Sequence, residues 1–151
     1  MSAFSPAEIN YLQSQFLGRI ATVGSDGQPH VVPVGFRYNP EYDTVDIGGH
    51  DFAKRKKFRD VRQNPHVAFV VDDVASVNPW RVRGIEIRGE AEILETGGQS
   101  VRPGFAAEMF RIRPTRVISW GLETDTCSTS TSYYSAHDVP SEEKNSKRPQ
   151  T

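Results

Sequence analysis

The sequence predicts a mainly β fold, an open or closed antiparallel barrel whose ends are covered by helices. Two features of the chain predict it. Short runs rich in β-branched residues are separated by turn signals at Asp26-Gly27 and Asn39-Pro40. Further along, the stretch from Trp80 alternates apolar and charged residues over the length of a long strand. With 151 residues the chain can bury the core of one domain, and two domains would be a tight fit.

The first element is expected to be a helix that begins at Pro6, because proline suits the first helical position. Ser5 can cap this helix, and Glu8 follows three residues later, as in a capping box. Apolar residues then recur at helical spacing, at Ile9, Leu12, Phe16 and Leu17. We expect Gly18 to end the helix.

A three-stranded meander is predicted next, with strands at roughly 19–24, 30–38 and 44–49. One face of the second strand is unusual and carries Val31, Pro33, Gly35 and Arg37. Pro33 has no N–H to donate to a neighbouring strand, and Gly35 has no side chain to pack. Two interpretations are open. The strand is an edge or contains a bulge, or its backbone is left bare so that something flat can lie against it.

The next segment is strongly basic, and it is predicted to be a helix. Six of the nine residues at 54–62 are lysine or arginine, although the net charge of the whole chain is −1. Phe58 and Val61 are spaced to face inward on such a helix. The dipeptide Asn64-Pro65 is expected to end it, because the residue before a proline avoids the helical region.

Two strands, a short helix and a last strand complete the folded part. The stretch HVAFVVDD is interpreted as a strand that is buried on both faces, and WRVRGIEIRGEAEILE as the most regular strand of the chain. Gly84 stands where the apolar pattern changes phase, which indicates a β-bulge. The stretch GGQSVRPGFAAEMFRI allows a short helix with Phe105, Met109 and Phe110 packing, and PTRVISWGLE is expected to be the last strand.

The end of the chain has a different composition. We expect one folded domain over residues 1–122 and a polar, flexible tail over 123–151, since few residues in the tail can build a core. The single cysteine, Cys127, cannot form an internal disulfide, so a cytoplasmic location is expected. The N-terminus lacks the pattern of a signal peptide, and no stretch is apolar for long enough to cross a membrane.

Composition and motifs disfavour several classes of function. A near-zero net charge argues against a broad nucleic-acid-binding surface. None of the four histidines stands at metal-ligand spacing from a cysteine or another histidine, so no metal site is predicted. The sequence has no P-loop, dinucleotide fingerprint or nucleophile elbow. If the chain is an enzyme, a cofactor is therefore expected to perform the chemistry.

The basic helix has two interpretations, a solvated charged face or a site for an anion. The anion site is favoured because the lysines and arginines cluster at the start of the helix, where unpaired N–H groups and the helix dipole attract anions. Gly48-Gly49 stand just before it and let a ligand approach the main chain. Lysine supplies a point charge, and arginine can bind a phosphate with two hydrogen bonds. This pattern predicts a site for one phosphate and not for a long polyanion.

The order of five motifs resembles a known family. The motifs are GRIATVGSDGQPHVVPVGFRY, a strand end with glycines, KRKKFRDVRQNPHVAFVVDD, GIEIRGEAEIL and RVISW. In this order they are similar to the pyridoxamine 5'-phosphate oxidase-like superfamily, and more narrowly to its actinobacterial flavin/deazaflavin oxidoreductases. The resemblance covers about residues 8–122. It implies a split β-barrel of the FMN-binding type that forms a homodimer, with two cofactor sites at the subunit interface.

The resemblance also implies a cofactor, either coenzyme F420 as first choice or FMN. The family pattern places the phosphate on Arg55 and Lys57, and it has an asparagine where this chain has Asp60. Lys54 and Lys56 are extra cations that would suit the glutamate tail of F420. The full set of residues expected around the cofactor, with the flat ring against the first four, is Val32, Pro33, Val34, Gly35, Gly49, His50, Arg55, Lys56 and Lys57.

The activity that the resemblance implies is hydride transfer between the cofactor and a small organic substrate. The C-terminal substrate-phosphate motif of true pyridoxamine phosphate oxidases is missing, so that activity is not expected. Trp80 is a candidate for lining the site or a dimer contact, and Trp120 either lines the site or, as favoured, closes one end of the barrel as a large apolar residue. The alternative function is a non-catalytic binder or carrier of a flavin, F420 or haem on the same barrel. No metal, nucleic-acid or membrane partner is expected.

Overall fold

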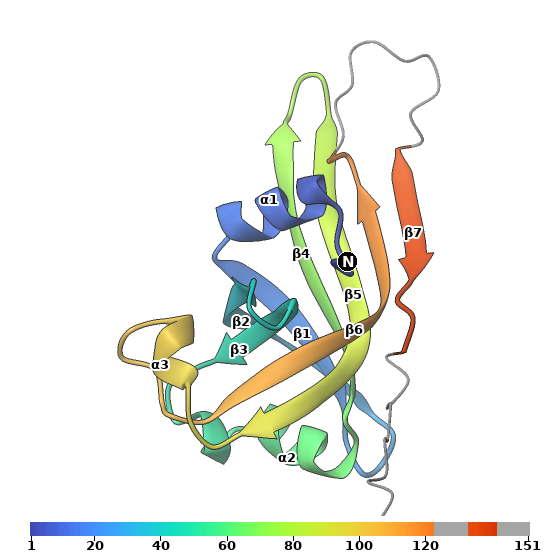
Figure 1. The fold of residues 1–151 in the computed structure, drawn as a ribbon. Coiled ribbons are helices and arrows are strands. Elements are labelled where there is room, and N and C mark those ends of the chain that lie inside the picture. Colours follow the sequence, from blue (N-terminus) through green and yellow to red (C-terminus); the bar gives the residue numbers. More distant parts are fainter. Residues whose placement is uncertain (123–132, 142–151) are drawn as a thin grey trace, which may run out of the picture.

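The computed structural model describes residues 1–122 and 133–141, which form a closed antiparallel β-barrel of six strands with helices at its ends (Figure 1). The barrel strands are β1 (Leu17–Val23), β2 (Pro29–Asn39), β3 (Thr44–Gly48), β4 (His66–Ser76), β5 (Arg81–Leu94) and β6 (Met109–Trp120). They lie side by side in the order β3-β2-β1-β4-β5-β6, and pairing of β3 with β6 closes the barrel. The mainly β barrel predicted from the sequence is confirmed.

Strand β2 changes its neighbours half-way along its length. β1 pairs with it from Pro29 to Gly35, and β3 pairs with it from Gly35 to Asn39. At Gly35 both neighbours meet, with Leu17 on one side and Gly48 on the other. Within the described part of the chain, each half of β2 therefore has one edge without a partner strand. The interpretation of this strand as an edge is correct for each half taken separately.

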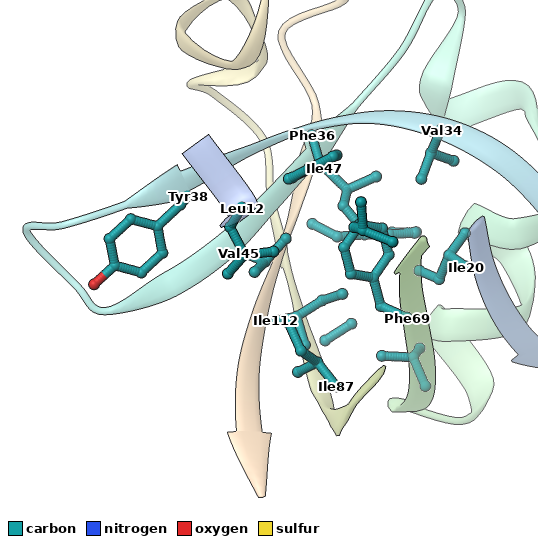
Figure 2. Packing of buried hydrophobic residues seen from close by; sticks show 14 of the residues in the cluster. Leu12, Ile20, Val34, Phe36, Tyr38, Val45, Ile47, Phe69, Ile87 and Ile112 are labelled. Atoms are coloured by element: carbon teal, nitrogen blue, oxygen red, sulfur yellow. The ribbon is translucent and has the colours of Figure 1, made fainter. Parts of the chain in front are cut away.

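The barrel interior is packed around Phe69 of β4. Figure 2 shows its ring amid side chains of β1, β2 and β6, among them Ile20 and Ile112. The ring meets Phe36 edge-on at a centroid distance of 5.2 Å. Gly18 of β1 lies beneath it, and a Cβ atom there would stand 2.4 Å from the Phe69 ring. Gly18 thus makes room for an aromatic ring, and the prediction that it ends the first helix is wrong.

Helix α1 (Pro6–Ser14) covers one end of the barrel (Figure 1). The predicted capping box is confirmed, since Ser5 Oγ accepts a hydrogen bond from the Glu8 backbone N–H and Glu8 Oε1 accepts one from the Ser5 N–H. The helix ends before Phe16 and Leu17, which are 71% and 53% exposed. Their helical spacing in the sequence therefore does not place them in the core.

The basic segment forms a helix at the opposite end of the barrel, as predicted. A short 3₁₀ helix (Phe52–Lys54) leads into α2 (Lys56–Gln63), and Asn64 caps its C-terminal end. Phe58 and Val61 are both buried, so the predicted inward face is correct. Phe58 stacks on Phe110 of β6 at a centroid distance of 5.7 Å, which fixes the helix against the barrel.

Strand β5 runs past Gly84 without the predicted bulge. Gly84 pairs regularly with Asp72 on β4 and with Trp120 on β6. The register shifts occur elsewhere, one of them between Arg88 and Gly89. A Cβ atom at Gly84 would stand 2.5 Å from the Trp120 ring, so the glycine is explained by the close approach of that ring. The phase change of the apolar pattern at Gly84 therefore coincides with the contact to the Trp120 ring, and β5 has no bulge there.

Strand β4 is buried on one face of the sheet only. Val67, Phe69 and Val71 point into the core, whereas Ala68 and Val70 on the other face remain partly exposed. The prediction of a strand that is buried on both faces is therefore wrong for the single chain. Ala68 and Val70 form an apolar stretch on the outer face of β4, between His66 and Asp72, and no layer covers it among the described residues.

The segment before β6 contains the predicted short helix, α3 (Gly98–Val101). Met109 and Phe110 are buried as expected, but they belong to β6 and not to the helix. No helix in the described ranges is long and apolar enough to cross a membrane. The expected cytoplasmic location stays a prediction, and Cys127 lies outside the described residues.

A seventh strand, β7 (Tyr134–Asp138), lies within the segment predicted to be a polar tail (Figure 1). It pairs with the C-terminal half of β6, from Arg116 to Trp120, where β6 has no contact with β3. No strand was predicted here, because the segment is short and its residues are mostly polar. Residues 123–132 and 142–151 lie outside the description, so the expected division of the chain at residue 122 stays a prediction.

We expect Phe69→Ala to lower the free energy of unfolding by about 3–5 kcal/mol, because the cavity lies where side chains of several strands meet. Urea unfolding followed by circular dichroism measures this loss. Val77→Ala, at a side chain that is 74% exposed, is the control and is expected to change stability by less than about 0.5 kcal/mol. Equal stabilities of the two variants would contradict the central position of Phe69.

Candidate cofactor site

All residues that the sequence places around a cofactor line one pocket of about 470 Å³. The pocket lies between β2, the end of β3 and the start of α2. From β2 and the segment after β3 come Val32, Pro33, Val34, Gly35, Gly49 and His50, and from the helix start come Arg55, Lys56 and Lys57. Gly48, which the sequence analysis named with Gly49 as a point of ligand approach, also lines the pocket, and His30 and Phe105, which it did not place at the site, complete the lining.

The pocket follows the half of β2 that has no partner on the β3 side. β3 ends opposite Gly35, so β2 residues from Pro29 to Val34 have only β1 beside them in the sheet. Proline is tolerated in such a place, because an edge position needs no backbone donor. Main-chain groups of this half-edge therefore face the pocket instead of another strand.

The bare backbone at Gly35 already has a flat group against it, the Phe105 ring. A Cβ atom at Gly35 would stand 2.9 Å from this ring, and so would a Cβ atom at Gly48, its partner across β2 and β3. The two glycines together make a shallow seat for one phenyl group. At Gly35 the flat group against the backbone is therefore a ring of the chain itself. That a flat ligand lies on this strand stays a prediction, and the part of β2 left open for one is Val32–Val34.

The loop that carries Phe105 is tied to the strand end beneath it. The Ala106 N–H donates to the Gly49 carbonyl oxygen at 2.9 Å, and the Phe105 N–H donates to that of Arg102 at 3.2 Å. His50 meets the Phe105 ring edge-on at a centroid distance of 5.3 Å. These contacts place an aromatic wall at one end of the pocket, opposite the cationic end.

The cationic end is the start of α2, where the first backbone N–H groups lack the partners of a helix interior. The Phe58 N–H is already used, since it donates to the Arg55 carbonyl oxygen at 3.2 Å. Arg55 is the N-cap residue, and its side chain forms no capping hydrogen bond. Lys57 is half-buried, with its ammonium 5.1 Å from the centroid of the Phe52 ring. Burial lowers the pKa of Lys57, and repulsion from Arg55 lowers it further. An anion bound between these two cations would relieve that repulsion.

Lys56 is held differently, because its ammonium is paired. Lys56 Nζ lies 2.9 Å from Asp60 Oδ1 and 3.1 Å from Asp60 Oδ2. Thr22 on β1 donates a second hydrogen bond to Asp60 at 2.8 Å. Burial raises the pKa of Asp60, but the hydrogen bonds from Lys56 and Thr22 outweigh it and hold the pKa below its usual value. Asp60 thus stays ionised and offsets much of the charge of Lys56.

His30 is a pocket residue for which the sequence analysis assigned no role. It pairs with Thr22 across β1 and β2, next to the Thr22 hydroxyl that donates to Asp60. Its Nδ1 atom is buried and has no hydrogen-bond partner within the described residues. The available signal was a histidine on the inward-facing side of a strand, in phase with Val32 and Val34. For Phe105 there was no comparable signal, because its position depends on the loop between α3 and β6.

The two tryptophans lie away from this pocket. Trp120 packs over Gly84 and beside Tyr134, with 6.4 Å between the two ring centroids. Trp80 is 66% exposed at the turn between β4 and β5. Over residues 1–122 and 133–141, no group of three or more histidine, cysteine or acidic side chains is arranged to hold a metal ion. The chemistry that this site can offer is therefore anion binding beside an apolar, flat-walled space.

Comparison with known proteins gives one family. The family model described as pyridoxamine 5'-phosphate oxidase matches residues 6–121 of the chain. The chain is 49% identical over 122 residues to a 5a,11a-dehydrotetracycline/5a,11a-dehydrooxytetracycline reductase from Streptomyces rimosus, covering 81% of this chain and 86% of the relative.

Solved structures share the barrel at lower identity. One is a conserved hypothetical protein from Mycobacterium tuberculosis, with a TM-score of 0.63 and 23% identity, covering 87% of this chain and 95% of the other. Another is an FAD-binding protein from Mycobacterium smegmatis, with a TM-score of 0.59 and 23% identity, covering 79% and 96%. These likenesses establish the split-barrel fold.

We expect Asp60→Asn to raise the affinity for inorganic phosphate roughly three- to tenfold, because removing the carboxylate leaves the Lys56 charge free for the anion. Asparagine can still accept the hydrogen bond from Thr22, so the helix stays in place. Isothermal titration with phosphate measures the change. The control is Asp72→Asn, which changes the net charge equally but removes an ion pair with Arg19. Unchanged phosphate affinity in a folded Asp60→Asn protein would show that Asp60 does not restrain Lys56.

Proposed function

We propose that this chain, which belongs to the pyridoxamine 5'-phosphate oxidase family, is a reductase that uses a bound flavin or deazaflavin cofactor. One observation carries the proposal. A single pocket combines a cationic helix start with an open strand edge and an aromatic wall. Such a pocket suits a molecule with a phosphate at one end and a flat ring at the other. The reductase activity of the relative at 49% identity points in the same direction.

The residues of the pocket fit such a cofactor. Arg55, Lys57 and the free N–H groups of α2 would hold the phosphate. The half-edge of β2 at Val32–Val34 would support the ring, and its main-chain groups are free to hydrogen-bond the ring edge. The cofactor would supply a hydride when bound. The protein would bind and orient it and keep water away from its reacting face.

For the cofactor itself we rank F420 before FMN, because the sequence resembles the deazaflavin-using branch of the family. Lys56 is paired with Asp60, and Lys54 does not line the pocket, so Lys54 would reach a glutamate tail only beyond the pocket. Titration with both cofactors side by side decides between them.

The proposed substrate class is taken from the relative at 49% identity, whose name specifies dehydrotetracyclines. We therefore propose a flat substrate with several fused rings and a conjugated double bond. Reduction of that bond needs a hydride on one carbon and a proton on the other. The reduced cofactor is the hydride source, and water or an acidic group is the proton source. The product therefore carries two more hydrogen atoms than the substrate, and the cofactor is left in its oxidised form.

The proposed assembly is a homodimer with the pocket at its interface, and the outer face of β1, β2 and β4 supports it. Val31 is 65% exposed there and pairs with Ala21, which in turn pairs with Ala68. Pro33 belongs to the same face and also lines the pocket. The β4 sequence is apolar enough for burial on both sides, and a second copy on this face would supply the missing layer.

We expect Lys57→Ala to weaken cofactor binding by about 1.5–3 kcal/mol, the loss of a charge-assisted hydrogen bond, which is roughly 10- to 150-fold in Kd. Quenching of F420 or FMN fluorescence measures the affinity. Arg59→Ala is the control, because Arg59 is exposed on the same helix and does not line the pocket.

Equal cofactor affinities of Lys57→Ala and the unaltered protein would count against the proposed phosphate position. Tight cofactor binding without reduction of any fused-ring acceptor would favour the alternative function, a non-catalytic carrier.

We expect Val31→Asp to convert a dimer to a monomer, because a buried, unpaired carboxylate at the interface is costly. Sedimentation velocity at micromolar concentration measures the assembly. Val77→Asp makes the same change at another exposed valine and is expected to leave the dimer intact. A monomeric unaltered protein, or a Val31→Asp variant that still dimerises, would contradict this interface.

A further inference from the structure

A second pocket, of about 800 Å³, lies along the other half of β2. There β1 has not yet begun, so β2 from Phe36 onward has a partner only in β3. Helix α1 and the end of α3 border this half-edge, and Figure 1 shows both helices beside β2 and β3. The second pocket shares no lining residue with the proposed cofactor site.

The lining is apolar with a few polar groups, which is the composition of sites for small organic molecules. Phe16 lines the pocket although its side chain is 71% exposed. Arg37 and Arg102 add positive charge, and Gln13 and Gln15 add hydrogen-bonding groups. The start of α2 does not line this pocket, so the pocket lacks the phosphate site proposed for the first one. The chemistry fits a flat apolar molecule with acidic or carbonyl oxygen atoms.

The two pockets are neighbours. Gly35 belongs to the first pocket and the next residue, Phe36, to the second. The loop after α3 forms the other part of the boundary, since Arg102 lines the second pocket and Phe105 the first. The guanidinium carbon of Arg102 lies 5.9 Å from the centroid of the Phe105 ring, so the two side chains stack across the boundary. A molecule in the second pocket would thus end beside the flat wall of the first.

We propose that the pocket between α1, β2 and α3 binds the fused-ring body of the substrate, with its reacting end toward Phe105. This inference rests on the proposed function, because it assumes a reductase whose cofactor ring lies along Val32–Val34. The volume of the pocket suits a body of several rings. Arg37 and Arg102 would attract ionised enol oxygens, which a fused-ring polyketone carries. Phe105 lies at the boundary of the two pockets, and the reacting end of the substrate would extend past its ring to contact the cofactor.

The experiment measures binding of oxytetracycline by its own fluorescence, without turnover, in the full-length protein. Gln13→Trp fills the pocket from an exposed position of α1, and Phe16→Ala removes an exposed wall, so neither change disturbs the core. Asn10→Trp on the same helix and Val77→Ala on the β4–β5 turn are the matched controls, and neither residue lines this pocket. Titration with F420 and FMN is carried out on every variant.

We expect Gln13→Trp to weaken oxytetracycline binding at least tenfold and Phe16→Ala about three- to tenfold, with both controls within twofold of the unaltered protein. Cofactor affinity should stay unchanged in all variants. Unaltered oxytetracycline affinity in both pocket variants would overturn the proposal, and so would loss of a dimer in Gln13→Trp, since a second copy would then occupy the pocket.

The outcomes also separate this inference from the proposed function. If the unaltered protein binds F420 or FMN but no oxytetracycline, the substrate class and this pocket assignment are both wrong, and the cofactor site stands. If it binds neither cofactor, the proposed function itself fails.

Discussion

The change of neighbours along β2 is the constraint on which the rest of the structure depends. A strand that pairs with β1 over one half and with β3 over the other leaves two half-edges, and Gly35 is the point where they meet. Each half-edge borders a pocket, because no third strand fills the space beside it. The closed barrel therefore has two pockets along one strand. Gly48, opposite Gly35, is part of the same constraint, since a side chain at either position would displace Phe105.

A buried carboxylate reduces the positive charge at the start of α2. Arg55, Lys56 and Lys57 stand there in succession, but the Asp60 carboxylate on the next turn pairs with Lys56. Two cations then remain for a ligand, and one of them is made less favourable by burial and by its neighbour. Such a site gains most from a single anionic group that fits between Arg55 and Lys57. The same carboxylate links α2 to β1 through Thr22, so the position of the helix and the charge of the pocket depend on one side chain.

Most of the strands and the two main helices could be predicted from the sequence, because turn signals, alternation and a capping box are local. The residues expected around a cofactor came from the basic segment, the bare backbone of the second strand and the resemblance to the family, and they line one pocket. The errors concern contacts between distant segments. Gly18 and Gly84 were interpreted through local pattern as a helix end and a bulge, whereas each makes room for an aromatic ring from another strand. The position of Phe105 depends on hydrogen bonds between its loop and Gly49, which no spacing rule predicts. Strand β7 is specified by a free edge of β6 more than by its own polar residues.

The most direct test is a crystal structure of the protein with F420 or FMN bound. We expect the phosphate within hydrogen-bond distance of Arg55 and Lys57, and the ring along Val32–Val34 with Phe105 at its end. A phosphate bound elsewhere, with Arg55 and Lys57 directed to solvent, would contradict it.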